Sequence, residues 1–135
     1  MQRIWRFLLD TRTLTVIGVA ALAGLPYEDI AFRVMRPYLG DSIIELMHRG
    51  EEELLQQTCH AQPALFAIEY ALARLWLHLG VVPVVVMGHS IGEFAAMVIA
   101  GALPLEQACR LIVRRGQLMQ ALPDGGKMLA ARLTE

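Results

Sequence analysis

The segment Val82-Pro83-Val84-Val85-Val86-Met87-Gly88-His89-Ser90-Ile91-Gly92-Glu93 carries the strongest structural signal in the chain. A continuous β-branched run followed by a turn is typical of a strand buried on both faces, as in a parallel sheet. Residues 84–87 therefore predict a buried parallel strand. A helix is expected from Glu93 to Gly101. The serine would then lie on the turn that joins the strand to the helix.

Gly88, Ser90 and Gly92 form a G-x-S-x-G pattern in the strand–turn–helix context that gives this pattern its meaning. Such a tight turn would point the Ser90 hydroxyl out above the sheet. A side chain at Gly88 or Gly92 is expected to clash with the neighbouring strand or helix. The N–H of Ile91 can then donate to an oxyanion. Ser90 is predicted to be a nucleophile, and His89 to line a pocket or pack. The alternative is a glycine-rich turn with an incidental serine.

Helical patterns flank this segment on both sides. Residues 61–79 are apolar nearly all round, which predicts a buried helix with Pro63 in its first turn and Gly80 at its end. Residues 104–122 predict a second helix. Further helices are expected over 27–39, 42–49 and 51–57, and a strand over 127–133. Helices that alternate with buried strands indicate an α/β fold.

Arg115 falls inside the apolar stripe of the helix expected over 104–122. The stripe recurs every three or four residues and consists of Ala108, Leu111, Ile112, Leu118, Met119 and Leu122. A guanidinium on a buried face needs a partner, because an unpaired buried charge is very costly. The partner is either a carboxylate of the protein or a substrate carboxylate, which arginine can bind through two N–H groups.

Composition and charge exclude several classes of protein. The net charge of −1 lacks the basic surplus of nucleic-acid-binding proteins. A hydrophobic content of 56% excludes a disordered tail and fits a buried part of a larger body. No apolar run reaches the roughly 18–20 residues of a membrane span, and the histidines show no metal-ligand spacing. Cys59 and Cys109 are expected to be buried thiols in a reducing, cytoplasmic compartment.

The first 26 residues are atypical. Arginines precede an apolar stretch over residues 14–25, which gives the outline of a secretory signal. Asp10 argues against a signal, so a strand plus loop, or a non-native gene start, is favoured.

Four blocks resemble the acyltransferase domain of modular type I polyketide synthases, which is similar to the malonyl-CoA:acyl-carrier-protein transacylase of fatty-acid synthesis. In the family's order, they are QPALFAIEYALA at 62–73, GHSIGE at 88–93, RGQLMQ at 115–120 and GGKMLA at 125–130. The resemblance covers about residues 31–133. It implies that 27–135 is a partial, α/β-hydrolase-like acyltransferase core with a nucleophile elbow. A ferredoxin-like small subdomain would begin at the C-terminus and stop after about 133.

The resemblance implies a ping-pong mechanism. Ser90 would take the acyl group from an acyl-CoA and pass it to the phosphopantetheine thiol of an acyl carrier protein. The Ile91 N–H would contribute to the oxyanion hole, Arg115 would hold the free carboxylate of a malonyl-type group, and Gln62 and His89 would line the substrate site. No metal or bound cofactor is expected. Partners would be malonyl-CoA, the carrier protein and other polyketide synthase domains, with no nucleic acid or membrane.

The chain also departs from the family's pattern. Residues 1–26 lack the family's Gly-Gln-Gly-Ser-Gln-like loop, and no histidine matches its general base. The histidines are His48, His60, His78 and His89. We therefore expect a truncated fragment with little or no activity alone. An α/β-hydrolase-type serine esterase, suggested by G-x-S-x-G alone, and a non-catalytic remnant are the alternatives.

The extender unit is expected to be malonyl. Ile91 follows the serine, as in malonyl-selective members of the family, whereas methylmalonyl-selective members usually carry glutamine there. Residues 57–62 also resemble the malonyl-type stretch.

Overall fold

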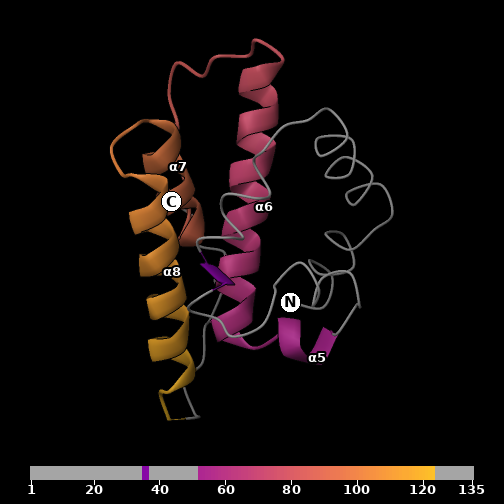
Figure 1. Cartoon of the computed structure of the whole chain (residues 1–135), viewed down its shortest axis with the longest axis vertical. Helices are drawn as coiled ribbons and strands as arrows, with labels where there is room; N and C mark the ends of the chain where they lie inside the picture. The colour runs from indigo at the N-terminus through magenta and orange to yellow at the C-terminus, as the bar shows by residue number, and fades with distance from the viewer. Residues whose placement is uncertain (1–34, 37–51, 124–135) are drawn as a thin grey trace, which may run out of the picture.

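The computed structural model describes residues 35–36 and 52–123 (Figure 1). Within these ranges the elements are helices. They are α5 (Glu52–Leu55), α6 (Thr58–His78), α7 (Ile91–Ile99) and α8 (Leu105–Gln120). Several predictions lie outside the described residues. They concern residues 1–26, the helix over 42–49, most of the helix over 27–39, and the strand and small subdomain near the C-terminus.

Helix α6 is the longest described element and begins at Thr58, earlier than expected. Pro63 therefore lies in the second turn and not in the first, so it leaves the Cys59 carbonyl without its helical N–H partner. The predicted end is confirmed, because Gly80 follows the C-cap with a φ of 84°, a conformation that glycine adopts without strain. The first half of α6 is buried, but the helix emerges toward its end, where Trp76 is exposed.

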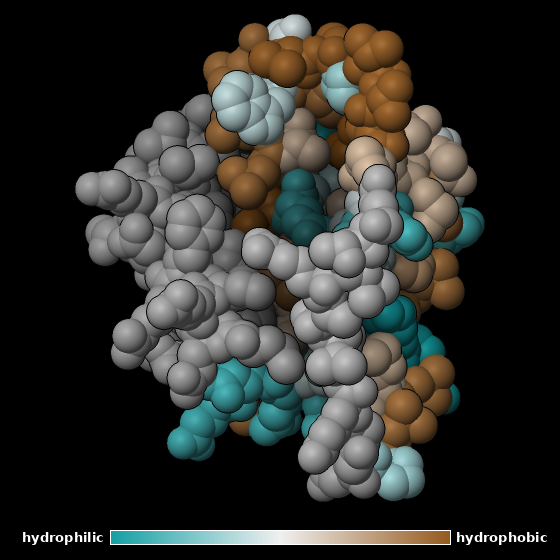
Figure 2. All heavy atoms as spheres, turned by 180° about the vertical axis from the view of Figure 1, so that it is seen from behind, coloured by the Kyte–Doolittle hydropathy of each residue, from teal (hydrophilic) through white to brown (hydrophobic). Residues whose placement is uncertain are grey.

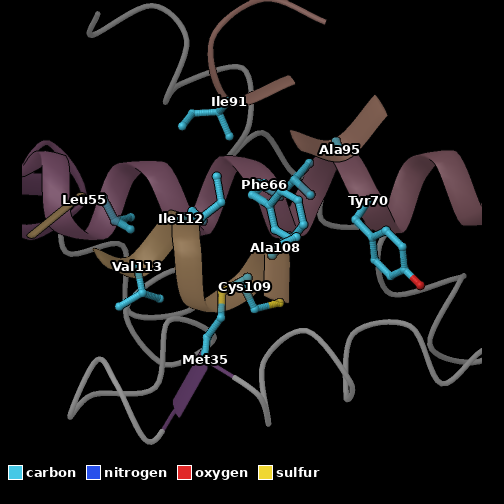
Figure 3. Close-up of a cluster of buried hydrophobic side chains, with 13 residues drawn as sticks. Met35, Leu55, Phe66, Tyr70, Ile91, Ala95, Ala108, Cys109, Ile112 and Val113 are labelled. Atoms are coloured by element: carbon cyan, nitrogen blue, oxygen red, sulfur yellow. The ribbon is translucent and has the colours of Figure 1, made fainter. Parts of the chain in front are cut away.

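The core forms where α6 packs against α8 and α7 (Figure 3). Phe66 stacks with Tyr70 on α6, with ring centroids 6.4 Å apart, and Ile112 of α8 is fully buried in the same cluster. Each such side chain contributes about 1.5–3 kcal/mol through its burial. This contact fixes the position of α8 relative to α6, and with it the residues that α8 carries.

The predicted apolar stripe of α8 is only half buried. Ala108 and Ile112 are in the core, as expected. The other members are exposed: Leu111, Leu118, Met119 and Leu122. The buried face is instead rotated toward Cys109, Val113 and Gly116, which are all buried. Gly116 allows the close approach, since a Cβ there would lie 3.0 Å from the Thr58 carbonyl oxygen.

The predicted buried strand over residues 84–87 is not observed. The segment connects α6 to α7 without strand structure, and Val84 and Met87 are 98% and 90% exposed. A strand exists only through hydrogen bonds to a neighbouring strand, and no strand lies beside it among the described residues. The apolar side chains of this connection form an exposed surface at the end of α6, at the top of Figure 2. Within the described residues the structure therefore shows helices, as the α/β prediction requires, but not the predicted strand.

Both cysteines are free thiols, as expected. Cys109 is fully buried, and burial raises the pKa of its thiol to about 12. Cys59 is only partly buried, so the prediction of its burial is wrong. Within residues 35–36 and 52–123, no helix is long and apolar enough to cross a membrane. The same residues contain no cluster of metal-ligating side chains.

Gly116→Val should destabilise the protein, because its γ-carbons would press on the α6 backbone at Thr58 and Cys59. Overpacking of this kind costs about 1–3 kcal/mol, so thermal denaturation should show a melting temperature lower by roughly 5 °C or more. Gln107→Val, on the exposed face of α8, controls for the helix propensity of valine. A Gly116→Val protein as stable as this control would contradict the close packing of the two helices.

Candidate active site

Ser90 occupies a strained turn immediately before α7. Its φ is 56° and its ψ is −110°, and it is the one described non-glycine residue with a positive φ. Such strain persists only where the surrounding structure enforces it, and it is common at functional sites. A Cβ on Gly88 would overlap the backbone of Gly92 and Glu93, so the expected clash is confirmed there. A Cβ on Gly92 would lie at an ordinary 3.8 Å from the Glu69 carboxylate, so the clash expected at that position is wrong.

Ile91 is the first residue of α7, and its side chain is buried. The first N–H groups of a helix lack a carbonyl partner within the helix. They also lie at the positive end of the helix dipole. The position of Ile91 next to Ser90 is therefore compatible with the predicted oxyanion-hole role, which stays a prediction.

Arg115 reaches from α8 to the serine turn. Its Nη2 donates to the Ser90 Oγ over 3.4 Å, and its Nη1 donates to the Gln62 Oε1 over 2.5 Å. Among the described residues, no carboxylate forms a salt bridge with this guanidinium. Of the two predicted partners for Arg115, a carboxylate of the protein is thus not found in this part of the chain.

Gln62 lies in the second turn of α6 and is only 6% exposed. Its Oε1 accepts the Arg115 hydrogen bond, and its Nε2 donates to the Met119 Sδ over 3.2 Å. The sequence placed Met119 in the buried stripe of α8 and gave it no part in the site. Gln62 of α6, Arg115 of α8 and Ser90 of the turn before α7 come together, although Gln62 and Arg115 are 53 positions apart.

His89 is separate from this group. It lines an open pocket of about 760 Å³ between α6, α7 and the connection that joins them. Ser90, Arg115 and Gln62 do not line this pocket. His89 therefore lines a pocket, as expected, but Ser90 and Arg115 do not line that pocket. Among the described histidines, none hydrogen-bonds to the Ser90 hydroxyl, whose one described partner is Arg115.

Glu69 is a partly buried acid in a mostly apolar part of α6, and the sequence predicted no role for it in the site. It projects from α6 into the same pocket as His89. Its Oε2 is buried and has no hydrogen-bond partner among the described residues. Burial raises the pKa of this carboxyl group above its ordinary value. Glu69 thus lies beside Gly92, behind the serine turn, and makes no described contact with Ser90.

Comparisons with known proteins show which family and which relatives the chain resembles. A family model described as an acyl transferase domain matches residues 29–135. The chain is 52% identical over 103 residues to the polyketide synthase GfsA of Streptomyces halstedii, covering 76% of this chain and 1% of that protein. It is 46% identical over 123 residues to the mycoketide-CoA synthase of Mycobacterium tuberculosis, covering 88% of this chain and 3% of that protein.

Two solved structures are similar to this chain. One is an acyl carrier protein S-malonyltransferase from Vibrio cholerae, with 40% identity, a TM-score of 0.66, and coverage of 78% of this chain and 36% of that one. The other is a malonyl-transacylase in complex with a type II polyketide synthase acyl-carrier protein, with 38% identity, a TM-score of 0.66, and coverage of 79% and 35%. The chain therefore spans about a third of the length of these structures and a few per cent of the synthases.

The resemblance to polyketide synthase acyltransferases is confirmed by the family match and by these relatives. The range matched by the family model contains the serine turn, the arginine that reaches it and the glutamine that holds the arginine. On these grounds the chain belongs to the acyl transferase domain family.

Proposed function

We propose that this chain is an acyltransferase of polyketide or fatty-acid biosynthesis, which accepts a malonyl-type group from acyl-CoA onto Ser90. The group is then passed to the phosphopantetheine thiol of an acyl carrier protein. The observation that carries the proposal is the 3.4 Å contact between the Arg115 Nη2 and the Ser90 Oγ. A guanidinium this close to the nucleophile can bind the free carboxylate of a dicarboxylic acyl group while its thioester carbonyl meets the serine.

The chemistry consists of two acyl transfers. The Ser90 oxygen attacks the thioester carbonyl, the carbon–sulfur bond breaks, and coenzyme A leaves with the proton as a free thiol. The carrier-protein thiol then attacks the acyl-serine ester, and the proton returns to Ser90. In both steps the Ile91 N–H and the N-terminus of α7 would stabilise the negative charge on the carbonyl oxygen.

The solved relatives support the malonyl group and the carrier protein as substrate and partner. One is named as a malonyltransferase, and the other is a malonyl-transacylase bound to an acyl-carrier protein. The polyketide synthases among the relatives support a role beside other synthase domains. An esterase of the α/β-hydrolase type would have no use for a guanidinium that faces its serine.

Ser90 should become malonylated when the chain is incubated with malonyl-CoA. Mass spectrometry of proteolytic peptides should place the adduct on the peptide that contains Ser90. Ser90→Ala should abolish the adduct, and a simple activated ester should label Ser90 more weakly than malonyl-CoA does. Preferential labelling by the simple ester would favour an esterase and contradict the proposal.

Arg115→Ala should reduce the rate of malonyl labelling by about 10- to 100-fold, because charge-assisted hydrogen bonds contribute roughly 1.5–3 kcal/mol. Labelling by acetyl-CoA, which has no free carboxylate, should change little. Arg114→Ala is the matched control, since Arg114 is exposed on the neighbouring face of α8. Equal losses for the two acyl-CoAs would rule out the carboxylate-binding role.

The chain of residues 1–135 should show little catalytic turnover from malonyl-CoA to a carrier protein. A serine hydroxyl is a weak nucleophile without a base in hydrogen-bond reach, and no described histidine contacts Ser90. A carrier-protein acylation assay measures this directly. Rapid turnover that Ser90→Ala abolishes would show that one of the four histidines acts as the base.

A further inference from the structure

The Gln62 amide is held at both ends by α8. Its oxygen accepts from Arg115, and its nitrogen donates to the sulfur of Met119 at 3.2 Å. The two α8 residues are four positions apart, so they lie one turn apart on the same side of the helix. Gln62 is 6% exposed, which leaves its amide little access to water as an alternative partner.

The orientation of this amide decides whether Arg115 has an acceptor. Arginine has only donors, so a Gln62 amide turned by 180° would set its NH₂ group against the guanidinium. The thioether sulfur of Met119 is a weak acceptor and has no N–H to offer. It therefore favours the orientation in which the nitrogen faces Met119 and the oxygen faces Arg115.

We propose that Met119 is a positioning residue, whose sulfur orients the Gln62 amide and thereby sets the Arg115 guanidinium beside Ser90. The proposal rests on the proposed function, in which Arg115 binds the carboxylate of the acyl group. Met119 touches neither Ser90 nor the substrate in this account. Its effect reaches the site through Gln62 alone.

The backbone holds Met119 at this place independently of its sulfur. The Thr58 N–H donates to the Gln120 Oε1 over 2.7 Å, so the residue after Met119 ties the end of α8 to the start of α6. Gly116 brings the same two helices into close contact. Met119 itself is 43% exposed, so core packing does not account for its contact with Gln62.

The first experiment measures the side-chain amide signals of Gln62 and the guanidinium signals of Arg115 by nuclear magnetic resonance in the full 135-residue chain. Met119→Leu keeps the size of the side chain but removes the acceptor, and it is expected to shift or broaden both sets of signals. Met119→Gln offers a carbonyl acceptor and should restore them toward the wild-type pattern. Met97→Leu, at a methionine of similar exposure on α7, is the matched control and should change neither.

The second experiment measures the dissociation constants of malonyl-CoA and acetyl-CoA by calorimetry. Met119→Leu should weaken malonyl-CoA binding by about 3- to 10-fold, the value of one modest hydrogen bond, and leave acetyl-CoA binding unchanged. Met119→Gln should restore most of the affinity for malonyl-CoA. If Met119 had a purely structural role, Met119→Leu would weaken the binding of malonyl-CoA and of acetyl-CoA to the same extent.

The two experiments separate the two proposals. Wild-type protein that binds both acyl-CoAs equally would overturn the proposed function, while the resonance signals would still decide the role of Met119. Gln62 and Arg115 signals that are the same in Met119→Leu as in wild type would overturn the positioning role, as would an unchanged preference for malonyl-CoA. If Met119→Leu fails to fold, the Met119→Gln variant tests the positioning role. That role requires the Gln62 and Arg115 signals of Met119→Gln to be close to those of the wild type.

Discussion

The hydrogen bond between Arg115 and Gln62 is the contact on which the candidate site depends. It joins α8 to α6 above the core, and it turns a long, flexible cation toward the serine at the start of α7. A half-buried guanidinium is stable only with a polar partner. Gln62 supplies that partner without neutralising the charge. Arg115 therefore keeps its charge for a carboxylate, which a glutamate at position 62 would have cancelled.

Core packing makes this contact possible. Phe66 and Ile112 set the distance between α6 and α8, and Gly116 removes the side chain that would hold the helices apart. The serine turn depends on a second close approach, where Gly88 leaves room for the backbone of Gly92. This second close approach lies within the turn in which Ser90 has its positive φ. Strain of this kind persists only where the surrounding structure holds it in place.

Local chemistry explains which features the sequence could predict. The serine turn, the stop at Gly80 and the requirement for glycine at position 88 follow from short-range sterics, and each is observed. The position of Arg115 in the stripe of α8 predicted that it needs a partner. Gln62 entered as a site residue only through the resemblance to the family. Gln62 and Arg115 meet only in the folded structure, so the spacing of residues along the chain does not predict their contact.

The incorrect expectations concern burial and pairing between distant segments. Residues 84–87 have the composition of a buried strand, but burial needs neighbouring strands, and none is among the described residues. The α8 stripe was assigned by periodicity, which does not determine which side of the helix the neighbouring elements cover. Residues such as Leu111 and Leu118 are consequently exposed. Glu69 received no role from the sequence, because its pocket exists only once α6, α7 and their connection are folded together.

The most direct measurement of the central claim is a structure of the chain with malonate esterified to Ser90. The account predicts that the free carboxylate of the malonyl group lies within about 3 Å of the Arg115 guanidinium nitrogens, with both oxygens accepting. Gln62 would remain bonded to the same guanidinium. A malonyl carboxylate that points into solvent, with Arg115 turned away from it, would contradict the account.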